Sequence, residues 1–342
     1  MRSKSRANIM RHRLLLTVMS LRLSAALNIA VTGTNSGIGQ SAAKILLQNG
    51  HNVYHACRTV ESAGQAAAAA GGGVPMACDL ADLESVCAFA QTLSQMECVL
   101  DVLCLNAGIS ASRRAEMAKR TKDGFEETIG VNHLGHFCLA NLLQPKLARN
   151  NGTLVITASG VHDPESPGGT VQGDPATGAT LGDLSGLGAS SGAVMVDGAT
   201  VYGPAKAYHD SKLCNVLFAR EASRRWAGYV TVRSFNPGLI TSTGLFRAAR
   251  KDNWLGTAVF SFVAEKVAGF SVPVEVGGSR LAYLATASEE EVPHGSYFSA
   301  PAATSRATSR AEGFKEAKIS KEANDDALAA RLWERSAQLV GL

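Results

Sequence analysis

The stretch that decides the fold is Val31-Thr-Gly-Thr-Asn-Ser-Gly-Ile-Gly39, which lies between an apolar run and a helical pattern. Residues 27–31 predict a β-strand, and residues 37–50 predict a helix that stops at a glycine. Glycines let the backbone approach a ligand closely, and a helix N-terminus offers unpaired N–H groups to a pyrophosphate. The strand–turn–helix context therefore predicts a dinucleotide site. Its expected contacts are Gly33, Asn35, Ser36, Gly37, Ile38 and Gly39.

Outward from this stretch, short apolar runs alternate with helical segments, as a parallel α/β sheet requires. We predict a Rossmann-type doubly wound parallel sheet in a single domain, with a long insertion at 162–200 and a C-terminal helical extension. Strands are expected at 27–31, 52–57, 74–78, 99–105, 153–157, 230–235 and, as the last one, 296–299. Helices are expected at 37–50, around 66–70, and at 83–96, 124–149, 276–287 and 325–340, with one more through Tyr208 to about Trp226.

The predicted domain spans residues 26–300, with an apolar segment at 244–270 as a lid and residues 301–342 as the extension. Residues 1–25 carry five basic residues ahead of an apolar run that is too short to cross a bilayer. They resemble a targeting leader, either a signal peptide or an organellar presequence. The alternative is an N-terminal extension with Met10 as the true start.

Composition argues against several classes of function. The net charge is only +4 and no basic stripe occurs outside the N-terminus, so no nucleic-acid partner is expected. The seven cysteines lack paired spacing, which favours reduced, packed thiols over disulfides or a zinc site. His133 and His136 lie three apart on a predicted helix. Because no third ligand is evident, we expect them to pack beside the cofactor and predict no metal.

The end of the second strand selects the cofactor. An NAD site usually places an acidic residue about 20 positions after the glycines, where it binds the ribose 2′-hydroxyl. Here that place holds Arg58, whose guanidinium can bind a 2′-phosphate through paired hydrogen bonds. NADPH or NADP is therefore the expected cofactor. Further contacts are expected from Asp79 and Leu80 after the third strand, and from Asn106, Ala107 and Gly108 after the fourth.

Tyr208 and Lys212 lie one helical turn apart on one face of their predicted helix. An ammonium beside a phenol stabilises the phenolate, so Lys212 is expected to lower the pKa of Tyr208. Such a tyrosine can exchange a proton with a substrate near neutral pH. The spacing alone is a weak signal, but downstream of a nucleotide-binding start it predicts the acid of an oxidoreductase.

Three more features complete the pattern, namely Asn132, Ser159 and Pro237-Gly238. With the glycine motif, Asn106-Ala-Gly108 and the Tyr208–Lys212 pair, they resemble the short-chain dehydrogenase/reductase superfamily over residues 26–300. The fold and an NADP-dependent oxidoreductase activity are what this resemblance implies.

The same resemblance implies a role for each matching residue. Tyr208 would donate a proton, and Lys212 would tune its pKa and hold the nicotinamide ribose. Ser159 would orient the substrate oxygen, and Asn132 would organise a proton-relay water. The residues that would border the nicotinamide are Pro237, Gly238 and Ile240.

Longer stretches are similar to one branch, light-dependent protochlorophyllide oxidoreductase. They include Thr180-Leu-Gly-Asp-Leu-Ser-Gly-Leu187, Ala205-Lys-Ala-Tyr-His-Asp-Ser-Lys-Leu-Cys-Asn215 and Leu332-Trp-Glu-Arg-Ser-Ala-Gln-Leu-Val-Gly-Leu342. That branch also has a long insertion before the tyrosine helix, and here Ser159 and Tyr208 lie 49 positions apart. The resemblance implies light-driven reduction of a chlorin precursor by NADPH in a chloroplast.

One position departs from that branch, because Leu239 stands where the family has a cysteine after Pro-Gly. Asn106-Ala-Gly108 is also closer to ordinary dehydrogenases, since the photoenzymes usually carry Asn-Ala-Ala. A light-independent carbonyl reductase or a retinol/steroid-like alcohol dehydrogenase, in the endoplasmic reticulum or cytoplasm, is therefore an alternative. A non-catalytic protein that binds pigment or NADPH is a third.

An apolar or pigment-like small molecule is the expected substrate, and the predicted pocket residues are Leu239, Thr243 and Phe246. The apolar lid at 244–270 could contact the pigment, a membrane surface or a second subunit. Peripheral membrane contact and a homo-oligomer are thus both open.

Overall fold

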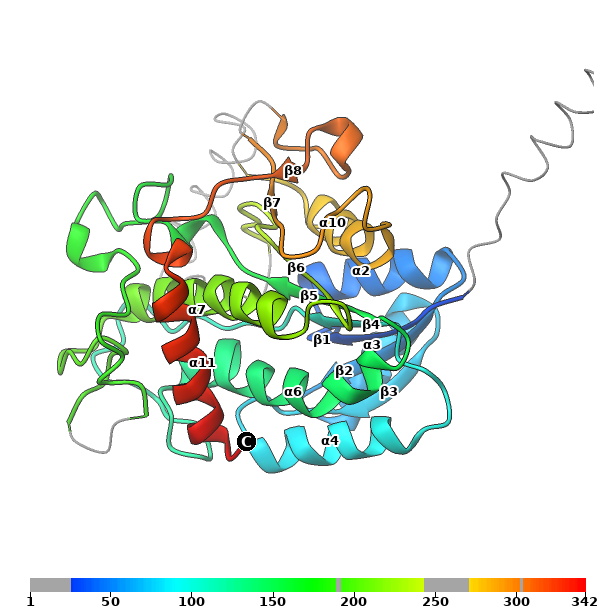
Figure 1. Ribbon diagram of the computed structural model, residues 1–342, viewed down its shortest axis with the longest axis horizontal. Helices are drawn as coiled ribbons and strands as arrows, with labels where there is room; N and C mark the ends of the chain where they lie inside the picture. Colours follow the sequence, from blue (N-terminus) through cyan, green and yellow to red (C-terminus); the bar gives the residue numbers. More distant parts are fainter. Residues whose placement is uncertain (1–25, 189–191, 243–270, 302–303) are drawn as a thin grey trace, which may run out of the picture.

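Figure 1 shows the computed structural model, in which residues 26–188, 192–242, 271–301 and 304–342 are described. Their core is an eight-stranded sheet in the order β3-β2-β1-β4-β5-β6-β7-β8. The first seven strands pair in parallel, and β8 pairs antiparallel with β7. The strands are β1 (Asn28–Thr32), β2 (Asn52–Cys57), β3 (Val74–Ala77), β4 (Val102–Leu105), β5 (Thr153–Thr157), β6 (Thr231–Phe235), β7 (Tyr297–Ser299) and β8 (Lys315–Glu316).

Helices cover both faces of this sheet, with α2 and α10 on one face and α4, α6 and α7 on the other (Figure 1). The described α-helices are α2 (Gly37–Gln48), α3 (Val60–Ala70), α4 (Leu83–Gln95), α5 (Glu127–Ile129), α6 (Gly135–Ala148), α7 (Pro204–Arg225), α10 (Val274–Thr286) and α11 (Asp326–Val340). A π-helical turn, η1 (Gly130–Leu134), joins α5 to α6. Short 3₁₀ turns are η2 (Gly160–His162), η3 (Pro175–Thr177), η7 (Arg310–Glu312) and η8 (Glu322–Asn324).

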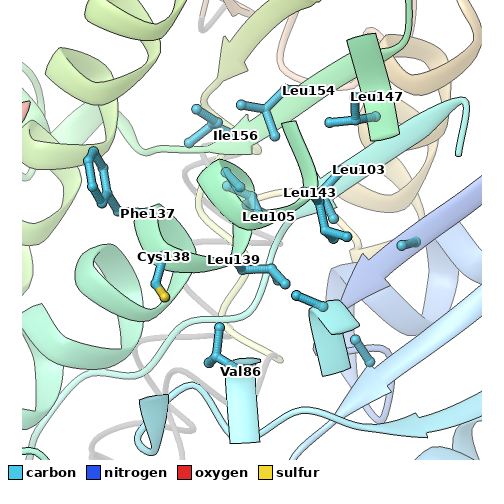
Figure 2. Packing of buried hydrophobic residues seen from close by; sticks show 14 of the residues in the cluster. Val86, Leu103, Leu105, Phe137, Cys138, Leu139, Leu143, Leu147, Leu154 and Ile156 are labelled. Carbon is cyan, nitrogen blue, oxygen red and sulfur yellow. The ribbon is translucent and has the colours of Figure 1, made fainter. Parts of the chain in front are cut away.

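Packing on the two faces follows the apolar periodicity of the helices. Figure 2 shows Val86 of α4, Leu139 of α6 and Leu103 of β4 within one cluster of buried side chains. Burying one such side chain contributes roughly 1.5–3 kcal/mol. On the other face, α10 lies so close to α2 that a Cβ on Gly278 would meet the Ser41 side chain at 2.3 Å. Glycine at 278 is therefore what permits this helix pair.

From β1 the strands follow in chain order to β3 on one side, and from β4 they follow in chain order to β8 on the other side. The strand order therefore switches direction between β1 and β4. In a doubly wound parallel sheet, ligands bind at the carboxyl ends of the strands beside such a reversal. The glycine-rich turn follows β1 at this edge, and Asn106 follows β4. The predicted fold class is confirmed, and it places the predicted cofactor residues at one edge.

Three predictions about secondary structure were wrong in detail. The helix expected at 124–149 begins at Glu127, and the π-helical turn η1, which contains Asn132, divides it into α5 and α6. The strand expected from residue 99 begins at Val102. The strand at 297–299 is not the last, since Lys315–Glu316 adds an antiparallel edge and brings the C-terminal extension into the same sheet. The domain limits at 26–300 and 301–342 stay predictions.

The described part of the insertion has little regular structure beyond η3, yet it is anchored by apolar side chains. Leu181, Leu184 and Leu187 are buried in a cluster with residues of α7 and α11. Helix α11 packs against α7 and α6, and its Trp333 contacts the rings of Phe137 and Trp226. The insertion and the C-terminal helix therefore form one supporting layer beside α7 (Figure 1).

All seven cysteines are free, as predicted, and Cys87 is the exposed exception among otherwise buried or half-buried thiols. Within the described ranges, no helix combines the length and the apolar character that crossing a bilayer demands. Residues 1–25 and 244–270, where a leader and a lid are predicted, lie outside the described residues.

Candidate active site

The turn after β1 is held in close contact with the turn after β4. Gly33 has a φ of +72°, and a Cβ there would lie 2.9 Å from the Ala107 Cα. The Thr32 hydroxyl oxygen accepts hydrogen bonds from the Asn106 and Ala107 N–H groups at 2.8 and 3.0 Å. A Cβ on Gly39 would lie 2.5 Å from the Gly33 carbonyl oxygen. Glycine is required at both positions, and these contacts hold the backbone of the glycine-rich turn in one conformation.

The N-terminus of α2 is free to receive an anion. Ser36 is the N-cap residue, but its side chain makes no capping hydrogen bond, and no acidic residue lies in the first turn. The N–H groups of that turn and the positive end of the helix dipole attract a phosphate. The predicted contacts Asn35, Ser36, Gly37 and Ile38 all lie at this helix start, so the turn fits a pyrophosphate.

Arg58 and Asp79 lie together where β2 and β3 end. Their side chains face each other across 3.9 Å between Nε and Oδ1, and the Arg58 side chain is 68% exposed. The long separation leaves most guanidinium donors available to a ligand phosphate. Asp79 also accepts a hydrogen bond from the Ala81 N–H at 3.0 Å, while Leu80 is buried. The edge predicted to bind a 2′-phosphate is therefore exposed and carries an available cation.

Asn132 lies in the π turn η1, and its side-chain amide makes three hydrogen bonds to protein groups. Its Oδ1 accepts from the Ile109 N–H at 2.8 Å, and its Nδ2 donates to the Ile109 carbonyl and to the Ser211 hydroxyl oxygen. The side chain thus joins the turn after β4 to α7. Both amide protons are therefore used, and the second lone pair of Oδ1 is the acceptor that the amide retains for a water.

His136 connects Asn132 to the start of the glycine motif. Its Nδ1 lies 3.1 Å from the Asn132 carbonyl oxygen and its Nε2 lies 2.9 Å from the Thr32 hydroxyl. A carbonyl can only accept, so Nδ1 carries the proton and Nε2 accepts from Thr32. Burial lowers the pKa of His136 to about 3, which keeps the ring neutral. The sequence prediction of packing beside the cofactor site agrees with this position.

Tyr208, Ser159 and Lys212 meet at the carboxyl end of β5. The Ser159 hydroxyl lies near enough to the Tyr208 phenol to lower its pKa, and the Lys212 ammonium lies 5.5 Å from the centroid of the Tyr208 ring. Ser159 is fixed through its carbonyl oxygen, which accepts from His162 Nδ1 at 2.7 Å. Tyr208 is half-buried and Lys212 is buried. The structure therefore brings the predicted acid, its orienting hydroxyl and the ammonium together.

The prediction that Lys212 lowers the pKa of Tyr208 is wrong for this structure. Burial raises the pKa of the Tyr208 phenol above its ordinary value, and the neighbouring Ser159 hydroxyl only partly opposes this rise. Burial also lowers the pKa of Lys212 to about 8. Desolvation outweighs charge attraction at this site because both groups lie away from water. At neutral pH the phenol keeps its proton.

Lys212 and Asn106 each retain hydrogen-bonding capacity for a polar ligand. Its Nζ donates to the Thr157 carbonyl at 3.3 Å, which uses one of three ammonium protons. The Asn106 Oδ1 atom is buried and has no hydrogen-bond partner among the described residues. A Cβ on Gly108 would lie 3.6 Å from Lys212 Nζ, so this turn passes directly beside the ammonium. The donors and acceptors fit the hydroxyls of a ribose.

The Pro237-Gly238 turn ends β6 at the same edge of the sheet. Gly238 has a φ of +90°, and the Pro237 carbonyl accepts a hydrogen bond from Arg280 at 2.8 Å. Leu239 is half-buried, and its carbonyl accepts from the Val272 N–H at 2.8 Å. Ile240 is buried. Of the predicted pocket residues, Leu239 lies at this turn, while Thr243 and Phe246 lie outside the described residues.

Two further buried histidines, His133 and His209, have structural partners. His133 Nε2 lies 2.8 Å from the Ser336 hydroxyl of α11, and His209 Nδ1 lies 2.7 Å from the Thr177 carbonyl of the insertion. Across the described ranges, no group of three or more potential ligand side chains could hold a metal ion. The sequence reasoning missed the bridging role of His136 and the contacts of Arg280. Only the four-residue spacing of Asn132 and His136 could have suggested the first.

The chain has clear relatives among known proteins. A family model described as short chain dehydrogenase matches residues 27–171. Protochlorophyllide reductase A, chloroplastic, from Triticum aestivum is 36% identical over 92% of this chain and 80% of its own length. Protochlorophyllide reductase from Avena sativa is 36% identical over 92% of this chain and 99% of its own. This chain belongs to the short-chain dehydrogenase/reductase superfamily.

Solved structures agree with that assignment. An uncharacterised protein from Mycobacterium paratuberculosis is 27% identical, with a TM-score of 0.65 over 92% of this chain and 93% of its own. A Beutenbergia cavernae protein described as a NAD(P)-dependent gluconate 5-dehydrogenase, with NADP bound at low occupancy, is 26% identical. Its TM-score is 0.55 over 80% of this chain and 95% of its own. The chain is an oxidoreductase of this superfamily, and the family agrees with the predicted NADPH/NADP cofactor.

Proposed function

We propose that this chain is an NADPH-dependent reductase of the protochlorophyllide type. The observation that carries the proposal is the Ser159–Tyr208–Lys212 site beside the glycine-rich turn, in a chain 36% identical to protochlorophyllide reductases along almost its whole length. The insertion between Ser159 and Tyr208, which packs against α7, also supports the proposal, because the protochlorophyllide branch has a long insertion at this place. Its small-molecule substrate is then a chlorin precursor. Its location is the chloroplast, in agreement with the relatives' names.

The residues divide the chemistry between them. Bound NADPH supplies the hydride. Tyr208 holds the proton to be donated, since its raised pKa keeps the phenol protonated at neutral pH. The Ser159 hydroxyl, which lies beside the phenol, orients it, and Lys212 offers its remaining donors to the ribose.

Cofactor choice follows from charge at the end of β2. The largely exposed Arg58 guanidinium is available to a 2′-phosphate, and its interaction with Asp79 is long at 3.9 Å. A charge-assisted contact there favours NADPH over NADH. The other proposed cofactor contacts lie at the turn after β1, at Asp79 and Leu80, at Asn106–Gly108 and at Pro237–Ile240.

One observation favours a second function. The half-buried Leu239 provides an apolar side chain without a proton to donate at the turn after β6, where the protochlorophyllide branch has a cysteine. A light-independent carbonyl reductase or alcohol dehydrogenase acting on an apolar substrate suits an apolar side chain at this position. The complete Asn132, Ser159, Tyr208 and Lys212 set disfavours a non-catalytic binding protein.

The test is an absorbance measurement on purified protein with NADPH and protochlorophyllide, in darkness and after a light flash. Conversion of the pigment that requires both NADPH and light supports the proposal. Absence of conversion, together with NADPH-dependent reduction of apolar aldehydes or ketones in the dark, contradicts it and selects the second function. Sedimentation of the protein with and without vesicles addresses the predicted membrane contact and oligomer.

A further inference from the structure

Arg280 of α10 is a buried arginine whose partners are backbone carbonyls. Its side chain is 1% exposed. Nη1 donates to the Pro237 carbonyl at 2.8 Å, Nη2 to the Ser305 carbonyl at 2.5 Å, and Nε to the Ala307 carbonyl at 2.8 Å. One guanidinium thus joins the turn after β6 to the first part of the C-terminal extension.

The charge of Arg280 has no acidic partner among the described residues, where no carboxylate lies within ion-pair distance of it. The ring of Phe314 lies 5.1 Å from the guanidinium carbon, a cation–π distance. Burial lowers the pKa of Arg280 to about 10, so the group is still charged at neutral pH. A buried, unpaired charge is costly unless its donors are satisfied, and here three carbonyls accept from three of the five N–H groups.

Gly238 and Arg280 constrain each other. Gly238 has a φ of +90°, and a Cβ there would lie 2.9 Å from Arg280 Nη1. The guanidinium therefore lies directly against the backbone of the Pro237-Gly238 turn. The position of this turn also determines where Leu239 and Ile240 lie, because they follow it immediately in the chain.

We propose that Arg280 is a positioning residue that fixes the Pro237-Gly238 turn for the nicotinamide half of the cofactor. Through Ser305 and Ala307 it couples the C-terminal extension to that half of the site. The inference rests on the proposed NADPH-binding function of this turn. The adenosine half, at Arg58 and the start of α2, receives none of the three hydrogen bonds of Arg280, although α10 itself packs against α2.

Arg233 of β6 offers a matched control. It is also buried, at 2% exposed, and it donates to the carbonyls of Leu284, Ala287 and Ser288. These three acceptors lie at the C-terminal end of α10 and just beyond it. Its removal therefore costs a similar set of hydrogen bonds without releasing the Pro237-Gly238 turn.

The experiment compares full-length Arg280→Met and Arg233→Met with the native chain. Two ligands are titrated by fluorescence or calorimetry, NADPH and 2′-phospho-ADP-ribose, which lacks the nicotinamide. Both variants should lose thermal stability. Arg280→Met should bind NADPH about 10-fold more weakly, the effect of losing one or two hydrogen bonds, and should keep native affinity for the fragment. Arg233→Met should keep native affinity for both ligands.

Native NADPH affinity in Arg280→Met, or an equal loss for NADPH and the fragment, overturns the inference. Equal NADPH losses in the two arginine variants overturn it too, since the effect would then follow stability alone. If Arg280→Met does not fold, Arg280→Lys provides the measurement, because it keeps one charged donor and should show a smaller loss confined to NADPH. A native chain that binds neither ligand contradicts the proposed function itself, a distinct result.

Discussion

The Lys212 ammonium lies 5.5 Å from the centroid of the Tyr208 ring, one helical turn further along α7. Both groups are desolvated, and burial moves their pKa values in opposite directions. The phenol therefore retains its proton at neutral pH, and the pKa of the ammonium is lowered to about 8. Tyr208 is therefore a protonated donor beside the charged Lys212, and the ammonium does not convert the phenol into a phenolate.

Tyr208→Phe should lower turnover by roughly 100-fold or more, because the ring stays while the proposed proton donor is lost. NADPH binding should remain near native, since no cofactor contact of the ring is removed. Tyr202→Phe is the control, as Tyr202 is also half-buried and its hydroxyl donates to Glu126 at 3.0 Å. Steady-state rates for both variants check the assignment. A Tyr208→Phe enzyme with a native rate would require another donor.

Lys212→Met should make the protein more stable at pH 7 while weakening cofactor binding and turnover. The folded pKa of Lys212, about 8, lies below the ordinary value of 10.5, so the unfolded chain holds the extra proton between these limits. The buried charge thus destabilises the fold fully below pH 8, and this cost fades as the pH rises toward 10.5. The gain on substitution is at most about 3 kcal/mol. Denaturant unfolding of both proteins at pH 7 and pH 10 measures it, and a gain that does not shrink with pH contradicts the sign.

Arg58→Asp should lower or reverse the preference for NADPH over NADH. The native preference is expected to be about 10-fold or more, because a charge-assisted hydrogen bond contributes about 1.5–3 kcal/mol. A second carboxylate beside Asp79 would repel the 2′-phosphate, while NADH lacks this group and is the internal control. Titrations with both cofactors decide the matter, and equal native affinities would remove Arg58 from the site.

The sequence predicted the parts of the site that depend on local geometry. Gly33 and Gly39 could be recognised because a tight turn at a helix start needs glycine, and Tyr208 and Lys212 because a helix places residues four apart on one face. The parallel sheet could be inferred from the alternation of strands and helices, since parallel strands need crossover helices. The glycine turn and the Tyr208–Lys212 pair each depend on a few neighbouring residues, and the alternation depends on the apolar pattern of each segment.

Features that join distant segments could not be predicted. The bond between His136 and Thr32 spans 104 positions, and Arg280 meets Pro237 across 43. The pKa of Tyr208 was mispredicted for the same reason, because desolvation depends on all the segments packed around α7. The π turn at Asn132 has no local signal either, and Ile109 and Ser211, the side-chain partners of Asn132, lie 23 and 79 positions away.

Leu239→Cys separates the two proposed functions. Leu239 follows the Pro237-Gly238 turn at the carboxyl edge of the sheet, where ligands bind, and it is half-buried there. If the chain is a photoenzyme weakened by the absence of the cysteine, a thiol restores a weak hydrogen-bond donor and light-dependent pigment reduction should increase. If the substrate is a dark carbonyl compound, pigment reduction should stay absent, and the change should cost only apolar packing. Leu239→Ala is the matched control, since it removes the leucine without adding a thiol.

Light-flash absorbance with NADPH present compares the native chain and both variants. A rise in the cysteine variant alone assigns the effect to the thiol, whereas equal rises in both variants assign it to added space in the pocket. Strong native photoactivity that neither substitution changes would show that the residue after Pro-Gly does not decide the function. The proposed reductase would then rest on Tyr208, Ser159 and Lys212, which supply a protonated acid, its orientation and a ribose contact without any thiol.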